Sequence, residues 1–348
     1  MIEQYTSKLQ NKQDLSFDEI SQAMEDILKG TVPDEKTATF LKCLREKGES
    51  DEELLGMLDQ MQSHAVHISP KHGGPIIDVC GTGGDKMRTF NISTAAAFVI
   101  AAAGGMVAKH GNRSVSGVSG SADIFEYFGY DLNATPERVT EIIEKFRIGF
   151  MFAPKFHPAM KNVVNARKMI GGRTAFNLLG PLTNPAQVKH QMIGVFSDEF
   201  LPRVISLLKN RGAETIMTVR SADGLDELTT TSKNKICLLK NGQIENITFD
   251  PQNLGLHKGI LNDIQISTKE EAITSFVSVL NNTANQTMIE VTALNAAGGL
   301  IVSNISNDFK DAIEIALDTI RNGSTYNLFE KFVRYCGDIN KLNGVEKS

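Results

Sequence analysis

From residue 76 onward, short apolar segments alternate with helical patterns, and this alternation restricts the fold more than any other feature of the chain. Residues 76–80 show a mostly apolar strand pattern, 92–103 a helical pattern and 106–109 a second strand pattern. The same order of strand, helix and strand recurs later, over residues 191–196, 199–209 and 215–219. Such alternation is typical of a parallel sheet with helices on both faces. We therefore predict an α/β fold with a mostly parallel central sheet flanked by helices.

The first 70 residues or so show only helical patterns. Ser16 and Ser50 each lie three residues before a glutamate, Glu19 and Glu53, which is the spacing of a capping box. Apolar residues recur at helical spacing behind both. With 348 residues, the chain is long enough for about two domains. We expect a helical domain over 1–72, joined in space by roughly 165–190, and an α/β domain over 73–348.

Three local patterns complete the expected secondary structure. Asn241-Gly242 lies between two strand patterns, 236–239 and 244–249, and predicts a hairpin at an antiparallel edge. Ser267 to Glu270 predicts a further capping box, which opens a helical C-terminal region. The Gly-Pro and Asn-Pro pairs within 177–185 predict a stiff, non-helical segment.

Composition excludes several classes of protein. The net charge of −5 argues against a nucleic-acid binder that works through bulk basicity. The four cysteines form no CxxC pair, so neither a disulfide framework nor a zinc site is indicated. The longest apolar run, residues 95–108, is too short to cross a bilayer. The first residues show no secretory signal pattern, so we expect reduced thiols and a cytoplasmic location.

Glycines gather where the predicted strands end. Residues 73–130 hold 11 of the 29 glycines of the chain. The first group is Gly81-Thr82-Gly83-Gly84-Asp85, followed by Asn91 to Thr94 at a predicted helix start. Glycine lets the backbone turn its N–H groups towards an anion, and a helix N-terminus favours phosphate. The pattern matches neither a Walker A loop nor GxGxxG.

A second group follows the second predicted strand, over residues 109–117 and 119–123. It contains the fixed cations Lys109 and Arg113, a histidine, an asparagine and several hydroxyls, which suits a phosphate ester. The alternative is an ordinary solvated turn, since Ser and Gly are common turn residues.

Two further features have both a functional and a plain interpretation. Residues 223–227, Asp-Gly-Leu-Asp-Glu, provide carboxylates suited to Mg²⁺, or else form an exposed acidic turn. Arg167 could hold a carboxylate in a two-pronged contact, or else be a surface arginine.

Six motifs together resemble the anthranilate phosphoribosyltransferase family. They are GTGGD, NIST, KHGNRS, GSAD, NLLGPLTNPA and DGLDE, in this order along nearly the whole chain, to about residue 335. The family transfers the phosphoribosyl group of phosphoribosyl pyrophosphate to anthranilate with Mg²⁺, releasing pyrophosphate, in tryptophan biosynthesis. The resemblance implies a fold like that of the pyrimidine nucleoside phosphorylases and a homodimer formed through the helical domain.

The resemblance also implies roles for individual residues. Lys109, His110 and Arg113 would be catalytic, with His110 mainly positioning the amine. Gly81, Asn112 and Arg167 would contact anthranilate, and Ser93, Asp226 and Glu227 would hold Mg²⁺. The implied contacts to phosphoribosyl pyrophosphate are Gly81, Gly84, Asp85, Thr89, Asn91, Ile92, Ser93, Thr94, Lys109, His110, Gly111, Asn112, Arg113, Ser114, Val115, Ser116, Gly117 and Ser121.

Two positions depart from the family pattern. Val118 stands where a basic residue is expected, so one cation near the phosphates is missing. Gly172 stands where a branched aliphatic residue is expected, which predicts a more flexible segment.

Two other functions stay open at this point. One is a pyrimidine nucleoside phosphorylase of the same fold, which would share the first glycine loop but not the KHGN or DGLDE segments. The other is a non-catalytic relative that binds nucleic acid, which should have lost the phosphate loops and gained a basic face.

Overall fold

The computed structural model describes residues 1–71, 73–84, 87–114 and 117–347, and Asp85, Val115 and Ser116 lie outside the described residues. The chain divides into two compact units. One comprises Met1–His67 and Ala153–Gln187, and the other comprises Ile68–Phe152 and Val188–Ser348. We propose that these units are the two domains expected from the sequence.

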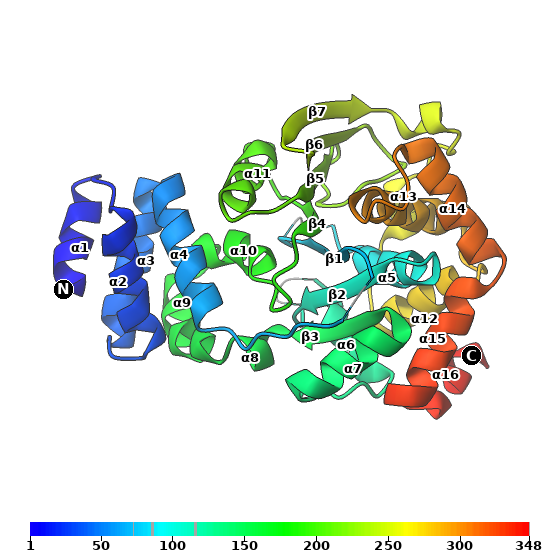
Figure 1. The fold of residues 1–348 in the computed structure, drawn as a ribbon, viewed down its shortest axis with the longest axis horizontal. Coiled ribbons are helices and arrows are strands. Elements are labelled where there is room, and N and C mark those ends of the chain that lie inside the picture. Colours follow the sequence, from blue (N-terminus) through cyan, green and yellow to red (C-terminus); the bar gives the residue numbers. More distant parts are fainter. Residues whose placement is uncertain (72, 85–86, 115–116, 348) are drawn as a thin grey trace. The chain divides into compact units, whose positions relative to one another are not determined.

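The first unit is helical (Figure 1). Its elements are α1 (Ile2–Gln10), α2 (Phe17–Leu28), α3 (Asp34–Lys47), α4 (Asp51–Ser63), α8 (Ala153–Phe156), η1 (Pro158–Val163), α9 (Val164–Ile170), α10 (Ala175–Leu179) and η2 (Gly180–Leu182). The later segment joins the N-terminal helices because α9 packs against α3 and η1 against α2.

Both N-terminal capping boxes are confirmed, at Ser16 and at Ser50. Glu53 does more than cap its helix, since its side chain is fully buried. Its carboxylate accepts hydrogen bonds from the backbone N–H of Leu15 at 2.9 Å and of Ser50 at 2.7 Å, and pairs with Lys47 at 2.8 Å. These bonds satisfy a buried charge, and they fix the turn between α3 and α4 to the segment before α2.

The prediction of a non-helical segment over residues 177–185 is wrong in its first part. Residues 177–179 end α10, and the 3₁₀-helix η2 follows directly. Pro181 occupies the first turn of η2, where a missing N–H costs nothing. The proline therefore helps to start a helical turn here instead of preventing one.

The second unit contains a seven-stranded sheet among its described residues. The strands are β1 (Ile76–Gly81), β2 (Met106–Gly111), β3 (Ile148–Phe152), β4 (His190–Gly194), β5 (Thr215–Ser221), β6 (Asn234–Lys240) and β7 (Gln243–Phe249). Their order is β3-β2-β1-β4-β5-β6-β7. The first five of these pair in parallel, and β6 and β7 are antiparallel, so the predicted α/β fold and its hairpin edge are both confirmed.

Helices cover both faces of this sheet (Figure 1). The helical elements of this unit are α5 (Ile92–Ala102), α6 (Ser121–Tyr127), α7 (Pro136–Phe146), α11 (Phe200–Asn210), η3 (Pro251–Leu254), η4 (Leu261–Ile264), α12 (Lys269–Leu280), α13 (Gln286–Val302), α14 (Phe309–Arg321), α15 (Ser324–Cys336) and α16 (Ile339–Glu346). Along β5, Met217 and Val219 join the core beneath α13, whereas the Thr218 hydroxyl donates to the Leu201 carbonyl of α11 at 2.8 Å. Alternate residues of the strand thus serve opposite helical layers.

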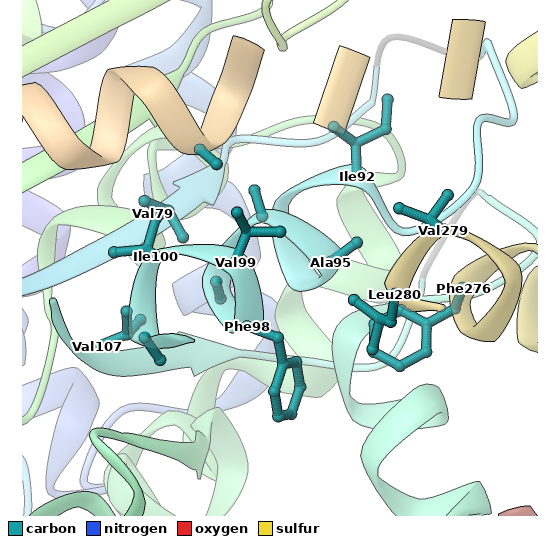
Figure 2. Close-up of a cluster of buried hydrophobic side chains, with 14 of the residues drawn as sticks. Val79, Ile92, Ala95, Phe98, Val99, Ile100, Val107, Phe276, Val279 and Leu280 are labelled. Carbon is teal, nitrogen blue, oxygen red and sulfur yellow. The ribbon is translucent and has the colours of Figure 1, made fainter. Parts of the chain in front are cut away.

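The main hydrophobic core surrounds α5. This helix is apolar on nearly all sides, as expected for a buried helix, and it is followed by β2, as the patterns over 92–103 and 106–109 predicted. Figure 2 shows Val79, Phe98, Val107 and Leu280 within this core. The Phe98 ring lies 5.0 Å from Phe329 and 5.4 Å from Phe332 between ring centres, in edge-to-face contacts.

Two elements of this unit differ from the sequence-based expectation. No strand was expected over Ile148–Phe152, yet β3 forms an edge of the sheet directly after α7. Only Arg147, with a left-handed φ of 60°, separates the two, so no Gly-Pro turn marks the boundary. The cap of α12 is Thr268, which accepts from the Glu271 N–H at 3.1 Å, so the predicted capping box from Ser267 to Glu270 is wrong by one residue.

The strand order reverses at β1. Strands β2 and β3 follow one another to one side of β1, while β4 and β5 follow to the other. In open α/β sheets, ligands bind outside the carboxyl ends of the strands at this reversal. We therefore expect a ligand site at the carboxyl ends of β1 and β4.

No helix among the described residues is long and apolar enough to span a membrane.

The helical unit contains a buried histidine that makes its stability depend on pH. Burial lowers the pKa of His157 to about 4, against backbone contacts to Thr183 and Met61 that act in the opposite direction. As the pH falls, the unfolded chain binds a proton near pH 6.5, before the folded protein does. The stabilising contribution is therefore complete above about pH 6.5 and is lost towards pH 4.

We predict that this one group lowers the free energy of unfolding by about 3 kcal/mol between pH 7 and pH 4. In denaturant titrations across this range, His157→Gln should show a smaller fall than the parent protein. Gln13 gives a control, because it is exposed and carries no titratable group, so Gln13→Ala should keep the parent slope. Equal slopes in the parent and His157→Gln would contradict the prediction.

Candidate active site

Asp226 lies against the ends of β1 and β4, where the strand order reverses. Gly81 and Gly194 are paired at these ends. A Cβ atom on Gly81 would lie 2.5 Å from Asp226 Oδ2, and one on Gly194 would lie 1.5 Å from the Asp226 carbonyl oxygen. Any side chain at either position would collide with Asp226. Glycine is required here for close approach.

The first glycine loop is bound to the same aspartate. The Gly83 N–H donates to Asp226 Oδ2 at 2.6 Å, across 143 residues of sequence. Gly83 and Gly84 have φ values of 68° and 83°, in the left-handed region that favours glycine. The Thr82 N–H donates to the Gly194 carbonyl at 2.9 Å, so the loop is held by the end of β4 as well as by Asp226.

Lys109 brings a buried cation to this edge. Its side chain is 1% exposed, and its ammonium donates to the Val79 carbonyl at 2.6 Å and to Ser93 Oγ at 3.2 Å. Ser93 is in the first turn of α5, so Lys109 joins β2, the end of β1 and a helix N-terminus. A buried ammonium is costly unless partners satisfy it, and these two acceptors fix its position.

A small cavity is lined by residues from five separate segments. Cys80, Ser93, Glu227 and Asn295 all line it. Two of the three predicted Mg²⁺ ligands, Ser93 and Glu227, therefore share one cavity, and the third, Asp226, is adjacent in sequence. Burial raises the pKa of the Cys80 thiol well above its usual value, so this group is a neutral thiol and not a nucleophile.

This donor set fits Mg²⁺. All three predicted ligands offer oxygen, which is the atom that Mg²⁺ prefers. Among the described residues, no group of three or more His, Cys, Asp or Glu side chains could hold a metal by itself. Mg²⁺ usually takes one or two carboxylates and completes its shell with water and substrate phosphates. Asp226 and Glu227, a carboxylate pair beside the first glycine loop, match this preference of Mg²⁺.

The second glycine loop is organised by Asp123. Its Oδ2 accepts from the N–H groups of Ser114 at 3.2 Å and Gly120 at 2.8 Å, and Lys269 pairs with its Oδ1 at 3.2 Å. Burial alone would raise the pKa of Asp123, but these hydrogen bonds lower it. The carboxylate is therefore ionised at neutral pH, and it holds the loop closed at both ends.

Arg113 forms an ion pair on the surface of the second loop. Its guanidinium binds the Glu126 carboxylate through two nitrogens, the second at 2.6 Å, and lies 5.7 Å from the centre of the Phe152 ring. Its neighbour Asn112 is exposed and accepts from the Arg113 N–H at 2.8 Å. Arg113 would have to release Glu126 before it could bind a phosphate.

Other predicted residues lie along the same loops. His110 is buried on β2, and its backbone N–H donates to Asp78 Oδ1 at 3.4 Å. Asn91 Nδ2 donates to the Ser119 carbonyl at 3.2 Å, which ties the start of α5 to the second loop. The buried Asn91 Oδ1 has no hydrogen-bond partner among the described residues. It is thus an available acceptor between the two loops.

The remaining predicted contacts divide between buried and accessible positions. A Cβ atom on Gly111 would lie only 2.2 Å from Ser121 Oγ, so the start of α6 packs closely against the end of β2. Ile92 and Thr94 are buried in α5, whereas Thr89, Ser114 and Gly117 keep accessible surface. Gly117 donates its N–H to Ser114 Oγ at 2.7 Å.

Arg167 belongs to the helical unit, on α9. Its guanidinium carbon lies 5.5 Å from the centre of the Phe176 ring, and Nη2 is 3.5 Å from Asn177 Oδ1. Burial lowers the pKa of this arginine, which still remains charged at any physiological pH. A guanidinium held in this way by a ring and an amide is prepared to receive a carboxylate.

The two departures from the family pattern have structural counterparts. Val118 packs against the hydrophobic core of the second unit. Gly172 has a φ of 77°, where a branched residue would be strained. The Arg45 side chain donates to the carbonyls of Gly171 at 2.9 Å and Arg173 at 3.2 Å, on either side of Gly172, so this turn is tied down within the helical unit.

Sequence reasoning missed three residues that shape the site. Gly194 was placed inside a predicted strand over 191–196, although its position at a strand end could have marked it. Asp123 belongs to the GSAD motif, but the motif alone does not show that this residue supports the loop. Asn295 gave no signal, because a single asparagine in an apolar helix has no pattern of its own.

We predict that Gly194→Ala disrupts the site, because its Cβ would collide with the Asp226 carbonyl. Backbone cannot yield as a flexible side chain does, so the acidic loop must move. Calorimetric titration should show binding of phosphoribosyl pyrophosphate weakened by about tenfold or more. The control Gly212→Ala changes a glycine with nothing within 4 Å of its Cβ position, although its φ of 80° adds local strain. Unchanged binding in Gly194→Ala would contradict this account of the strand ends.

Comparison with known proteins gives this geometry a context. Two family models match the chain, the glycosyl transferase family helical bundle domain over residues 3–65 and its a/b domain over residues 73–326. The anthranilate phosphoribosyltransferase of Nitrosopumilus maritimus is 62% identical over 345 residues, which cover 99% of each chain.

Solved structures agree with this. The crystal structure of anthranilate phosphoribosyltransferase from Thermus thermophilus has a TM-score of 0.88 and 34% identity, over 95% of this chain and 99% of that one. The Saccharomyces cerevisiae enzyme in complex with phosphoribosyl pyrophosphate and Mg has a TM-score of 0.86 and 25% identity, over 96% of this chain and 97% of that one. A further complex of the yeast enzyme contains 4-fluoroanthranilate. On identity, coverage and fold together, the chain belongs to the anthranilate phosphoribosyltransferase family.

Proposed function

We propose that the protein transfers the phosphoribosyl group of phosphoribosyl pyrophosphate to the amine of anthranilate. The products are N-(5-phosphoribosyl)anthranilate and pyrophosphate, in tryptophan biosynthesis. One observation carries the proposal: the acidic loop and the first glycine loop meet at the strand-order reversal through the Asp226–Gly83 hydrogen bond of 2.6 Å. This places oxygen ligands for a metal beside a glycine-rich backbone that a phosphate group can approach closely.

The reaction asks little covalent chemistry of the protein. The attacked carbon is anomeric, so the bond to pyrophosphate can break ahead of the new bond to nitrogen, with oxocarbenium character between. The protein must then stabilise negative charge on the leaving group and place a neutral aromatic amine. No strong general base is needed, because the arylamine loses its proton readily once it has attacked.

Lys109 is the best-supported cation for the leaving group. Its burial and its two fixed acceptors hold the ammonium beside the first loop without further reorganisation. Arg113 is the weaker candidate because Glu126 already binds it in a two-pronged contact. Ser93, Asp226 and Glu227 would hold Mg²⁺, which when bound would neutralise pyrophosphate oxygens.

The acceptor would be held by a second cation together with neutral groups. Arg167 would bind the carboxylate of anthranilate, and Asn112 and Gly81 would contact the ring or the amine. His110 would lie beside the amine as a positioning residue. We also propose a homodimer through the helical unit, supported by its exposed apolar residues Phe17, Val164 and Met169. Four free cysteines support a cytoplasmic location.

A direct assay tests the proposal. A mixture of the protein, anthranilate, phosphoribosyl pyrophosphate and Mg²⁺ should lose anthranilate fluorescence as the product forms. Chelation of Mg²⁺ should stop the loss, and excess Mg²⁺ should restore it. A folded protein without turnover in this mixture would contradict the proposal. Phosphate-dependent release of a pyrimidine base from a nucleoside would instead support the phosphorylase alternative, which no observation at present favours.

Arg167 gives a sharper prediction about the acceptor. Loss of a two-pronged contact to a carboxylate should cost about 2–4 kcal/mol of binding, so Arg167→Ala should raise the anthranilate KM by roughly 30-fold to 1,000-fold. The anthranilate KM of Arg167→Lys should lie between those of the parent protein and Arg167→Ala, since lysine keeps the charge but cannot form the two-pronged contact.

Steady-state kinetics with each substrate varied would measure both effects. The KM for phosphoribosyl pyrophosphate should change by no more than about twofold, and Lys168→Ala, at an exposed neighbour, should behave as the parent. An unchanged anthranilate KM in Arg167→Ala would remove this residue from the acceptor site.

A further inference from the structure

Two buried asparagines grip the chain just after the acidic pair. Asn295, on α13 and 2% exposed, accepts from the Leu228 N–H at 3.0 Å and donates to the Leu228 carbonyl at 2.7 Å. The same amide also donates to the Val291 carbonyl at 2.8 Å, one turn earlier in its own helix. The side chain is therefore fixed at both its oxygen and its nitrogen.

Asn234 repeats this arrangement on the next residue. It is fully buried at the start of β6, where its Oδ1 accepts from the Thr229 N–H at 2.8 Å and its Nδ2 donates to the Thr229 carbonyl at 2.8 Å. Two consecutive residues of a connecting loop thus have both backbone groups satisfied by buried amides. The amides come from two different elements, a helix and a strand.

The upstream side of the acidic pair is fixed as well. The Asp226 carbonyl lies against Gly194, and its carboxylate accepts from Gly83. Asp226 and Glu227 are therefore held between the sheet edge and the two amide contacts. Adjacent carboxylates repel each other without a cation, so a loop that carries them needs such restraint to keep a usable geometry.

Asn295 is also close to the predicted metal ligands themselves. It lines the small cavity together with Ser93 and Glu227. Its amide is already occupied by three backbone groups, which makes it a poor metal ligand and a good support. Groups that orient metal ligands from behind typically change metal affinity by about 10–100-fold when they are removed.

We propose that Asn295 and Asn234 are positioning residues that hold Asp226 and Glu227 in the geometry for binding the divalent cation with its phosphorylated substrate. This inference rests on the proposed function, since it takes the acidic pair to be the metal site. It predicts that the loss of either amide weakens metal binding more than it weakens anthranilate binding.

The test measures Mn²⁺ affinity, with and without phosphoribosyl pyrophosphate, by electron paramagnetic resonance of the free ion. Asn295→Asp keeps the side-chain size but replaces the donor that faces two carbonyls. We expect its Mn²⁺ affinity to fall by about tenfold or more, and its anthranilate KM to change by no more than about twofold. Asn234→Asp should shift Mn²⁺ affinity in the same direction.

Thr292→Val is the matched control. Thr292 is fully buried on the same helix, and its hydroxyl has no hydrogen-bond partner among the described residues. The substitution keeps the shape of the side chain and should leave Mn²⁺ affinity at the parent value. All measurements are made at a temperature well below the thermal midpoint of each variant, so that unfolding is not mistaken for a loss of binding.

Each outcome decides something. Parent-like Mn²⁺ affinity in folded Asn295→Asp would overturn the inference and leave the proposed function standing. If Asn295→Asp does not fold, Asn234→Asp decides alone, and parent-like affinity there would overturn the inference. A parent protein that binds neither Mn²⁺ nor phosphoribosyl pyrophosphate would instead overturn the proposed function.

Discussion

The approach of Asp226 to the ends of β1 and β4 is the constraint on which the candidate site depends. It requires glycine at 81 and 194, because a Cβ atom at either position would collide with this residue. It also satisfies a buried carboxylate, since the Gly83 N–H donates to it. One residue thus couples the phosphate-type loop to the acidic loop, and it does so where the strand order reverses.

Groups of both signs of charge lie at this edge of the sheet. A buried ammonium on Lys109 and the start of α5 both favour negative charge at the same edge. The carboxylates of Asp226 and Glu227 would repel a polyphosphate by themselves, and a divalent cation removes that conflict. The signs of the groups that the fold brings together therefore support the proposal that the protein uses Mg²⁺. Arg113, in contrast, is balanced locally by Glu126.

Local patterns in the sequence were sufficient to predict the α/β class, the hairpin edge, the two N-terminal capping boxes and the loops at the strand ends. They failed where a boundary lacks turn residues, as before β3 at Ile148, and where a proline starts a helical turn, as at Pro181. The residues of the loops could be named from motifs, whereas their supports could not. Asn295 and Asn234 act through tertiary contacts to Leu228 and Thr229, and such contacts leave no periodicity or spacing in the sequence. Roles that the motifs imply for single residues, such as His110 and Asn112, remain predictions.

The most direct test of the account is a crystal structure with phosphoribosyl pyrophosphate and Mn²⁺ bound. The account predicts an anomalous peak within coordination distance of Asp226 or Glu227, about 2.0–2.2 Å, with the diphosphate on the backbone of residues 81–84 and the Lys109 ammonium beside it. A metal peak away from both carboxylates, or a diphosphate bound outside the ends of β1 and β4, would contradict it.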